Sequence, residues 1–356
     1  MRNFNRLIDA VQRNCDIADA RHARDATLCT YLLEMREYYR WENDLPPDAL
    51  PGKDELGAWL SQREALLSEL EDESFGTLPV GDASLDAFDT QGVNAKLLPQ
   101  GYVYGGGYGR FHRPHFFLAR LDRAEQREGL TVLVAGCEYA RDLSAPPAVL
   151  RNGTVYLRRE SMLRWLREKV ELWGARKSDG ALSAALDRYG FGADPRAALE
   201  RMAQAETEAI ILHEVGEARA DAMLGDRWRD MIAALTSRRA ELTARAVRDN
   251  LADCDSTLPA LIESASDASI HFYFANFDGM RLALFPSLER AYRRWRESGE
   301  HGALAEAVSA GRAHWEAAAR RLLAIHADAP GGDADRAKAA EALDARIEAE
   351  QGALTL

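Results

Sequence analysis

The segment from Asp194 to Gly225 constrains the fold most, because it carries the signals for one long helix. Asp194 is followed by Pro195, and a capping side chain before a proline at the first helical position is typical of a helix start. Gly225, followed by Asp226, ends the pattern. The segment therefore predicts a long helix within a helical bundle.

Helical patterns also cover most of the remaining chain. Apolar residues recur at steps of three and four between Phe4 and Glu42, with one interruption near residues 16–22. A further helix is expected to begin at Asp54, and helical periodicity continues from about Glu160 to Ile325. These patterns predict a mainly α-helical protein.

Residues 101–158 have a different composition, rich in β-branched and aromatic residues. The expected strands are Tyr102–Tyr104, Phe116–Leu121, Leu130–Val134 and Thr154–Leu157. Their connections are short, which favours an antiparallel meander. Asn152 and Gly153 predict a turn between two of these strands.

The glycine run Gly105–Gly109 is expected to form a hairpin that is either a simple turn or a lid over a site. It does not match a phosphate-binding loop, because the residues after it do not begin a helix. His112 and His115 follow it, and they are either surface groups or metal ligands.

The expected fold class is mainly α with a small antiparallel β-sheet (α+β) and a helical bundle core. Four segments are expected: an N-terminal helical segment (1–100), the β-meander (101–158), a C-terminal helical bundle (159–330) and a loosely docked tail (331–356). The tail follows the chain-breaking run Ala329–Asp333.

Charge excludes two classes of partner. The chain of 356 residues has a formal net charge of -12 and no block of lysines or arginines. Nucleic acids and anionic membranes need clustered positive charge, so neither is expected as a partner. No segment approaches the roughly 20 apolar residues of a transmembrane helix.

The cysteines predict a reducing compartment. Cys15, Cys29, Cys137 and Cys254 form no paired spacing typical of a metal site or a disulfide framework. The first ten residues also lack the apolar core of a signal peptide. A cytoplasmic protein is the expectation.

The candidate site lies on the long helix, where His213, Glu214 and Glu217 read H-E-x-x-E. This pattern lacks the second histidine of the zincin motif H-E-x-x-H. At helical spacing His213 and Glu217 share a face with Glu206 and Asp221. We refer to these four residues as the polar stripe.

A second helix is expected from Ser237 to about Cys254, and it carries Asp249 and Asp253 four residues apart. If it returns beside the long helix, these carboxylates approach His213 and Glu217. One histidine with several carboxylates suits a divalent metal such as Mn, Fe, Zn or Mg.

The first functional hypothesis is therefore a metal-dependent hydrolase or related metalloenzyme. His213, Glu217, Asp249 and Asp253 would be the metal ligands, and Glu214 would be the general base that activates water.

The second hypothesis is a non-catalytic helical protein that binds a small ligand or a protein partner. The polar stripe is then a structural ion-pair network, which gathers ionisable residues just as an active site does. The sequence does not select a substrate or an oligomeric state.

Three stretches carry a resemblance that spans most of the chain: Arg21–Glu42, His213–Ala218 and Arg245–Asp253. They resemble a bacterial family of uncharacterised hypothetical proteins. The resemblance implies no particular activity.

Overall fold

The chain divides into two compact units, Met1–Leu166 and Arg167–Leu356. The computed structural model describes residues 2–22, 25, 27–46, 49, 51–109, 113–176, 179–327 and 336–356. The expected segments 1–100 and 101–158 both fall in the first unit, and 331–356 falls in the second. The finer four-segment division stays a prediction.

The first unit combines helices with two sheets. Its helices are α1 (Arg2–His22), α2 (Leu28–Glu42), α3 (Lys53–Leu70), α4 (Thr90–Leu97) and the short helix η2 (Leu98–Gln100). Its strands are β1 (Leu78–Val80), β2 (Ala83–Leu85), β3 (Tyr102–Tyr108), β4 (Pro114–Arg127), β5 (Leu130–Arg141), β6 (Ala148–Arg151) and β7 (Thr154–Arg158). Helix α5 (Arg159–Arg176) follows β7 directly and contains the boundary between the units.

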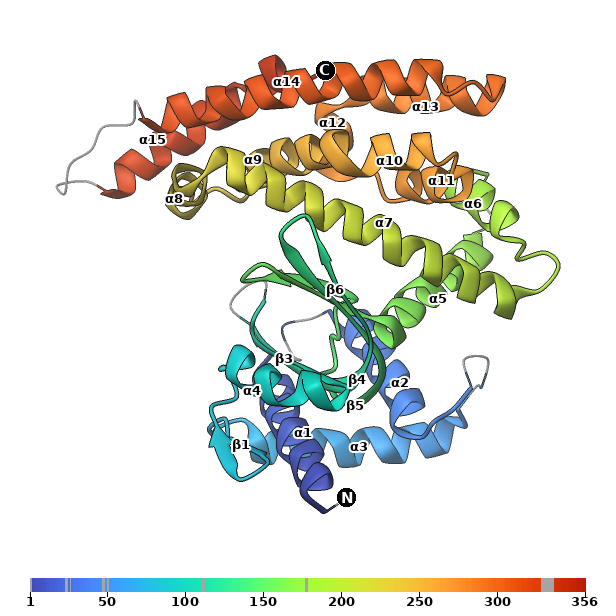
Figure 1. Cartoon of the computed structure of the whole chain (residues 1–356), viewed down its shortest axis with the longest axis vertical. Helices are drawn as coiled ribbons and strands as arrows, with labels where there is room; N and C mark the ends of the chain where they lie inside the picture. Colours follow the sequence, from blue (N-terminus) through green and yellow to red (C-terminus); the bar gives the residue numbers. More distant parts are fainter. Residues whose placement is uncertain are drawn as a thin grey trace. The chain divides into compact units, whose positions relative to one another are not determined.

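The larger sheet has the strand order β3-β4-β5-β7-β6, and Figure 1 shows that it is strongly curled. Two of its hairpins are closed by tight two-residue turns. Glu128 and Gly129, between β4 and β5, have φ of 52° and 85°, and Asn152 and Gly153, between β6 and β7, have φ of 48° and 72°. Positive φ at both central residues is typical of type I′ hairpin turns. The predicted turn at Asn152 is confirmed.

The predicted small antiparallel meander is wrong in both size and strand direction. The sheet has five strands, and β5 pairs with β7 in parallel, from Thr131 opposite Thr154 to Ala135 opposite Arg158. Parallel neighbours need a connection of about a dozen residues or more. Residues 142–153 supply it, with β6 lying inside the connection and at the edge of the sheet. The fold is therefore helix-rich with a curled, mixed five-stranded sheet and a separate two-stranded sheet, β1-β2.

The glycine run is also placed differently from the expected turn or lid. Residues 105–107 lie within β3 and pair with β4. A Cβ at Gly105 would lie 2.1 Å from the Phe117 ring, and a Cβ at Gly107 would lie 1.9 Å from Nη1 of Arg151. These glycines therefore make room for large side chains that cross the strand.

Helices cover the larger sheet within the first unit. Helix α1 packs against β4 and β5, and α4 packs against β3. The shared core includes Val11 and Cys15 of α1 with Phe116 and Leu118 of β4, all fully buried. The apolar face of α1 that the sequence shows is thus the face that meets the sheet.

The described part of the second unit is helical throughout. Its helices are α6 (Ala181–Tyr189), α7 (Pro195–Leu224), α8 (Asp226–Ala234), α9 (Arg238–Ala252), the π-helical η4 (Asp253–Thr257), α10 (Leu258–Glu263), α11 (Asp267–Ala275), α12 (Gly279–Leu284), α13 (Pro286–Ser298), α14 (Gly302–Ala327), α15 (Arg336–Ala349) and α16 (Gln351–Leu354). The predicted long helix is confirmed as α7, with Asp194 accepting hydrogen bonds from the backbone N–H groups of Arg196 and Ala197.

The end of the chain packs onto this helical core. Leu343, Ile347 and Leu354 are buried in it. The Asp344 carboxylate accepts hydrogen bonds from the backbone N–H of Thr236 and of Ser237, just before α9 begins. Across the ranges that the structure describes, no helix is both long enough and apolar enough to cross a membrane.

Candidate functional site

The structure brings the residues of the predicted site together on three neighbouring elements, α7, α9 and η4. Helix α7 carries His213 and Glu217, and it packs against both α9 and η4. Asp249 lies in the last turn of α9, and Asp253 is the first residue of η4. Which contacts these groups make decides what the cluster can do chemically.

His213 lies between two carboxylates. Its Nδ1 is 2.8 Å from Oδ1 of Asp253, and its Nε2 is 3.3 Å from Oε1 of Glu217. Burial alone would lower the pKa of His213, but the two carboxylates outweigh this effect and raise the pKa well above its ordinary value. The two carboxylates therefore favour the protonated imidazole, with one ring nitrogen beside each of them.

Asp253 is the centre of this contact network. Its carboxylate accepts hydrogen bonds from Tyr273 at 3.0 Å and Thr257 at 3.2 Å, and it forms an ion pair with Arg281. Burial favours the protonated form, but Arg281 and His213 outweigh it and lower the pKa of Asp253 to about 2. The carboxylate is thus charged and has two cationic partners.

Glu217 is compensated in the same way by an arginine from α9. Nη2 of Arg248 lies 2.9 Å from Oε1 of Glu217 and 3.1 Å from Oδ1 of Asp249. Despite its burial, Glu217 has a pKa lowered to about 2, because His213 and Arg248 stabilise its charge. Burial and the nearby Glu217 raise the pKa of Asp249 instead. Asp221 stands at the edge of this group, 3.7 Å from Arg248.

Glu214 and Glu206 have different surroundings. Within the described residues Glu214, the predicted base, makes no hydrogen bond or ion pair, and burial together with Glu217 raises its pKa to about 7. Glu206 accepts a hydrogen bond from the Tyr189 hydroxyl at 2.5 Å, which also contacts Ser269 at 2.9 Å. Burial raises the pKa of Glu206 to about 8. Glu206 therefore belongs to a separate group of hydrogen-bonded side chains.

Gly216 explains how α7 comes so close to its neighbour. A Cβ at this position would lie 2.4 Å from the backbone oxygen of Ala252 and 3.1 Å from Cβ of Ser256. The absence of a side chain at Gly216 therefore permits the close approach of the α9 backbone. It allows His213 to reach Asp253, at the point where the α-helix changes to a π-helical turn.

The cluster shows the contacts of an ion-pair network rather than those of a preformed metal site. Within the described ranges, no group of three or more His, Cys, Asp or Glu side chains has the arrangement of a metal site. A histidine ligand must be neutral, whereas the carboxylates beside His213 favour its protonated form, and Glu217 and Asp253 are already paired with arginines. The cluster has the chemistry of an ion-pair network.

The first unit contains a cavity of about 330 Å³. Helices α4 and η2 provide one part of its lining, and strands β5 to β7 provide the rest. The lining residues are Thr90, Gln91, Asn94, Ala95, Leu98, Thr131, Leu133, Arg151, Asn152, Thr154 and Tyr156. This volume is at the lower end of the range of small-molecule sites, about 300–1,000 Å³.

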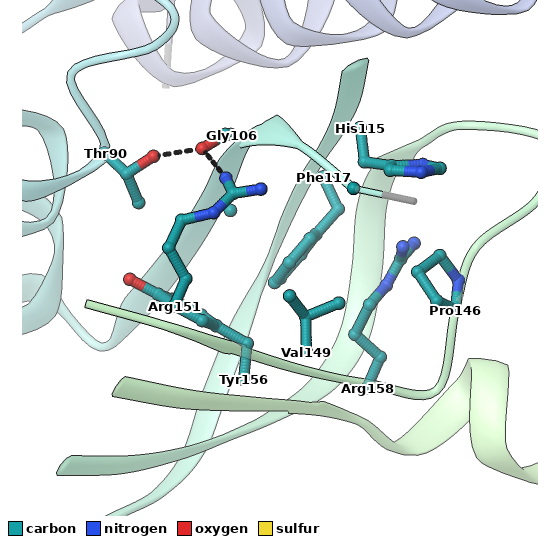
Figure 2. Close-up of a pocket in the computed structure, with 11 residues that line it drawn as sticks. Thr90, Gly106, His115, Phe117, Pro146, Val149, Arg151, Tyr156 and Arg158 are labelled. Atoms are coloured by element: carbon teal, nitrogen blue, oxygen red, sulfur yellow. Dashed lines mark hydrogen bonds between the residues drawn. The ribbon is translucent and has the colours of Figure 1, made fainter. Parts of the chain in front are cut away.

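A smaller cavity of about 30 Å³, drawn in Figure 2, shares Thr90, Arg151 and Tyr156 with the larger one. Arg151 donates hydrogen bonds to the backbone oxygens of Gly106 and of Tyr108, the latter at 2.6 Å. Because β3 and β6 are the two edge strands of the curled sheet, Arg151 links its edges.

The other arginine of the small cavity, Arg158, is fully compensated. It donates two hydrogen bonds to the Glu138 carboxylate, at 2.9 and 2.8 Å, and lies 3.9 Å from Asp142. His115 lies in β4, 3.5 Å from Asp142, while His112 falls outside the described residues. The charged end of β5 thus holds buried ion pairs.

Two family models match the chain, one for each unit. The model of the N-terminal domain of a family of unknown function, DUF6866, matches residues 6–158, and the model of its C-terminal domain matches residues 163–350. The chain belongs to the DUF6866 family. No curated protein and no solved structure matches it. The resemblance to an uncharacterised family is therefore confirmed.

The two candidate sites of this DUF6866 chain differ in how well they could be predicted from the sequence. The C-terminal cluster follows from helical spacing, whereas the cavity of the N-terminal domain has residues that we did not single out: Asn94, Arg151 and Tyr156. Arg151 directly precedes the turn at Asn152, which is its only local signal. Arg151 lies on β6, which is an edge strand because it pairs only with β7. The place of β7 beside β5 depends on their parallel pairing, which the sequence pattern did not show.

Proposed function

We propose that the protein binds a small organic molecule in the cavity of its first unit. One observation carries the proposal: a cavity of about 330 Å³ has a polar lining around Arg151, and none of its lining residues is acidic. Small-molecule sites commonly combine such a volume with a few convergent polar groups. This is a binding function without an assigned reaction.

In this proposal, the C-terminal cluster has a structural role. His213 joins α7 to η4 through Asp253, and Arg248 joins α9 to α7 through Glu217. Every charge in these contacts has an opposite charge beside it, which supports a network that fixes the helices.

The test uses three probes with one ring and different charges: neutral benzamide, anionic benzoate and cationic benzylamine. Ligand-observed NMR on the full chain should detect binding of at least one of them. Ala95→Trp, at an exposed position that lines the cavity, should abolish that binding by filling the space. Ala58→Trp, at an exposed position of α3, is the matched control and should bind as the unmodified protein does. If no probe binds, or if Ala95→Trp changes nothing, the proposal is wrong.

The metal-dependent hydrolase is the second candidate function. One observation favours it: Glu214 has a pKa raised to about 7, where a general base operates well at neutral pH. Metal analysis of natively purified protein tests this candidate. Stoichiometric Mn, Fe, Zn or Mg that is lost in His213→Ala would support it. If no metal is bound, and neither metal nor chelator shifts the melting temperature, the hydrolase is excluded in this form.

We also propose a cytoplasmic location. Cys15, Cys29, Cys137 and Cys254 are all free thiols in the structure, and Cys29 and Cys137 are exposed. Exposed free thiols fit a reducing compartment. Thiol titration of freshly isolated, denatured protein should find all four, and a disulfide between any two would contradict this location.

A further inference from the structure

Arg151 differs in its charge balance from Arg63 and Arg158, two buried arginines of the same unit. Arg63 and Arg158 each lie within 3 Å of a carboxylate oxygen, at 2.6 and 2.8 Å. Within the part of the chain that the structure describes, Arg151 has no carboxylate within 4.0 Å, although its side chain is half-buried. Burial lowers the pKa of Arg151 for this reason, because no counter-ion offsets the loss of solvent.

The guanidinium of Arg151 is also held in place before any ligand arrives. Its two hydrogen bonds to the β3 carbonyls of Gly106 and Tyr108 use two of the five N–H donors of an arginine. Among the described residues the other three donors have no partner, and the side chain lines the cavity. A fixed guanidinium with free donors is well suited to bind an anionic oxygen group.

The surroundings of Arg151 favour the same ligand chemistry. The chain has a formal net charge of -12 and 57 acidic residues, yet no Asp or Glu lines either cavity. The polar groups near Arg151 in the larger cavity are neutral hydroxyls and amides. Leu98 and Leu133 and the ring of Tyr156 add an apolar surface.

We propose that this cavity binds a small organic anion, whose carboxylate or phosphate oxygens accept hydrogen bonds from Arg151. The apolar part of the ligand lies against Tyr156, Leu98 and Leu133. This inference rests on the proposed small-molecule function and names the chemical class of the ligand.

The charge of the ligand is tested by calorimetric titration of the full chain at low salt. Benzoate and phenyl phosphate should bind at least tenfold more tightly than benzamide and benzylamine, and added salt should weaken their binding. The stronger of the two anions identifies a carboxylate or a phosphate as the preferred group. If benzamide binds as tightly as the anions, the anion proposal is overturned while the small-molecule function stands. If none of the four binds, both fail.

The role of Arg151 is tested by three variants. Arg151→Gln should weaken binding of the anions at least tenfold and leave benzamide unchanged. Arg151→Lys keeps the charge but loses the planar donor fork, so its affinity for the anions should lie between those of Arg151→Gln and the unmodified protein. Arg120→Gln removes the same charge from an exposed position of β4 that does not line the cavity, and it should have no effect. Unchanged anion binding in folded Arg151→Gln protein, verified by circular dichroism, overturns the assignment.

Discussion

The polar stripe with its partner helix and the cavity around Arg151 both gather polar side chains, but their charges are balanced in opposite ways. In the cluster of the second unit, the His213 cation contacts two carboxylates, and each of those carboxylates also pairs with an arginine. In the cavity of the first unit, the cation of Arg151 meets only neutral groups among the described residues. An unpaired charge, such as that of Arg151, therefore indicates a ligand site better than a high density of ionisable residues does.

This difference has an energetic meaning. A buried ion-pair network contributes little net stability relative to an apolar replacement, but removal of one partner leaves an uncompensated charge and is strongly destabilising. An unpaired cation at a cavity has the reverse behaviour: its removal affects a ligand more than the fold. Substitutions in the two regions should therefore separate stability from binding.

The largest expected effect is the loss of Asp253. Asp253→Ala leaves His213 and Arg281 without their shared carboxylate, and breaking a buried pair in this way costs about 4 kcal/mol of unfolding free energy. Asp255→Ala, two residues further along η4, is the control. The arginine partners of Asp255 are more exposed, so its loss should cost about 1 kcal/mol or less. Equal destabilisation by the two variants in urea unfolding would show that the cluster is not a cooperative network.

Much of the helical architecture could be predicted from the sequence, because the signals are local. Asp194, Pro195 and Gly225 mark the ends of α7, and apolar periodicity marks its neighbours. The sheet was predicted less well, because strand direction depends on pairing between distant segments. The glycine run shows the same limit: Gly105 and Gly107 serve side chains from β4 and β6 rather than a turn.

The candidate cluster could be predicted as a set of residues but not in its chemistry. Helical spacing indicated that Asp253 approaches His213, and the structure places them 2.8 Å apart. The ion-pair alternative did not specify which arginines compensate the carboxylates, because Arg281 comes from α12 and Arg248 of α9 meets Glu217 across two helices. Charge balance depends on tertiary contacts, so spacing alone does not distinguish a metal site from an ion-pair network.

A pH-dependent stability is the next largest effect, and it comes from Glu206. Its pKa is raised from 4.5 to about 8 in the folded state, so the folded protein retains a proton that the unfolded chain has lost. Stability should therefore fall as pH rises through this window, by about 3 kcal/mol between pH 5 and pH 7. Glu214, whose pKa is raised to about 7, adds a slope in the same window, so Glu206→Gln should reduce the slope by roughly half. Glu200→Gln, at an exposed position of the same helix, should leave it unchanged.

His213 acts in the same direction at higher pH. Because its folded pKa is raised, its contribution is present below its unfolded pKa of about 6.5 and is lost as pH rises through the folded value. Calorimetric melting from pH 5 to pH 9 measures both effects. A slope between pH 5 and pH 7 that is the same in Glu206→Gln and the unmodified protein would contradict the assignment to Glu206.

A smaller loss is expected at Gly216. Gly216→Ala forces a Cβ to within 2.4 Å of the Ala252 carbonyl oxygen and should cost about 2 kcal/mol through overpacking, despite the better helix propensity of alanine. Gly174→Ala in α5 meets nothing within 4 Å and should instead stabilise by up to about 1 kcal/mol. Thermal unfolding of the two variants checks the difference. If Gly216→Ala also stabilises, α7 and α9 are not held by this close approach.

The smallest change in stability is expected in the cavity itself, at Tyr156. Its hydroxyl makes a long hydrogen bond to Asn94, at 3.4 Å, and also contacts Thr154, so Tyr156→Phe should change the unfolding free energy by about 0.5 kcal/mol or less. If the hydroxyl helps to hold the anion, benzoate affinity should fall about fivefold, the equivalent of one hydrogen bond.

Tyr273→Phe in the cluster is the matched comparison for Tyr156→Phe. Its hydroxyl donates to the charged Asp253 at 3.0 Å, so its loss should cost about 1.5 kcal/mol and leave benzoate affinity unchanged. The two tyrosines thus separate the two regions with one identical atomic change. If Tyr156→Phe is as destabilising as Tyr273→Phe and leaves binding unaltered, the cavity is only another part of the packed structure. The difference between the paired charges of the cluster and the unpaired charge of Arg151 then has no functional meaning.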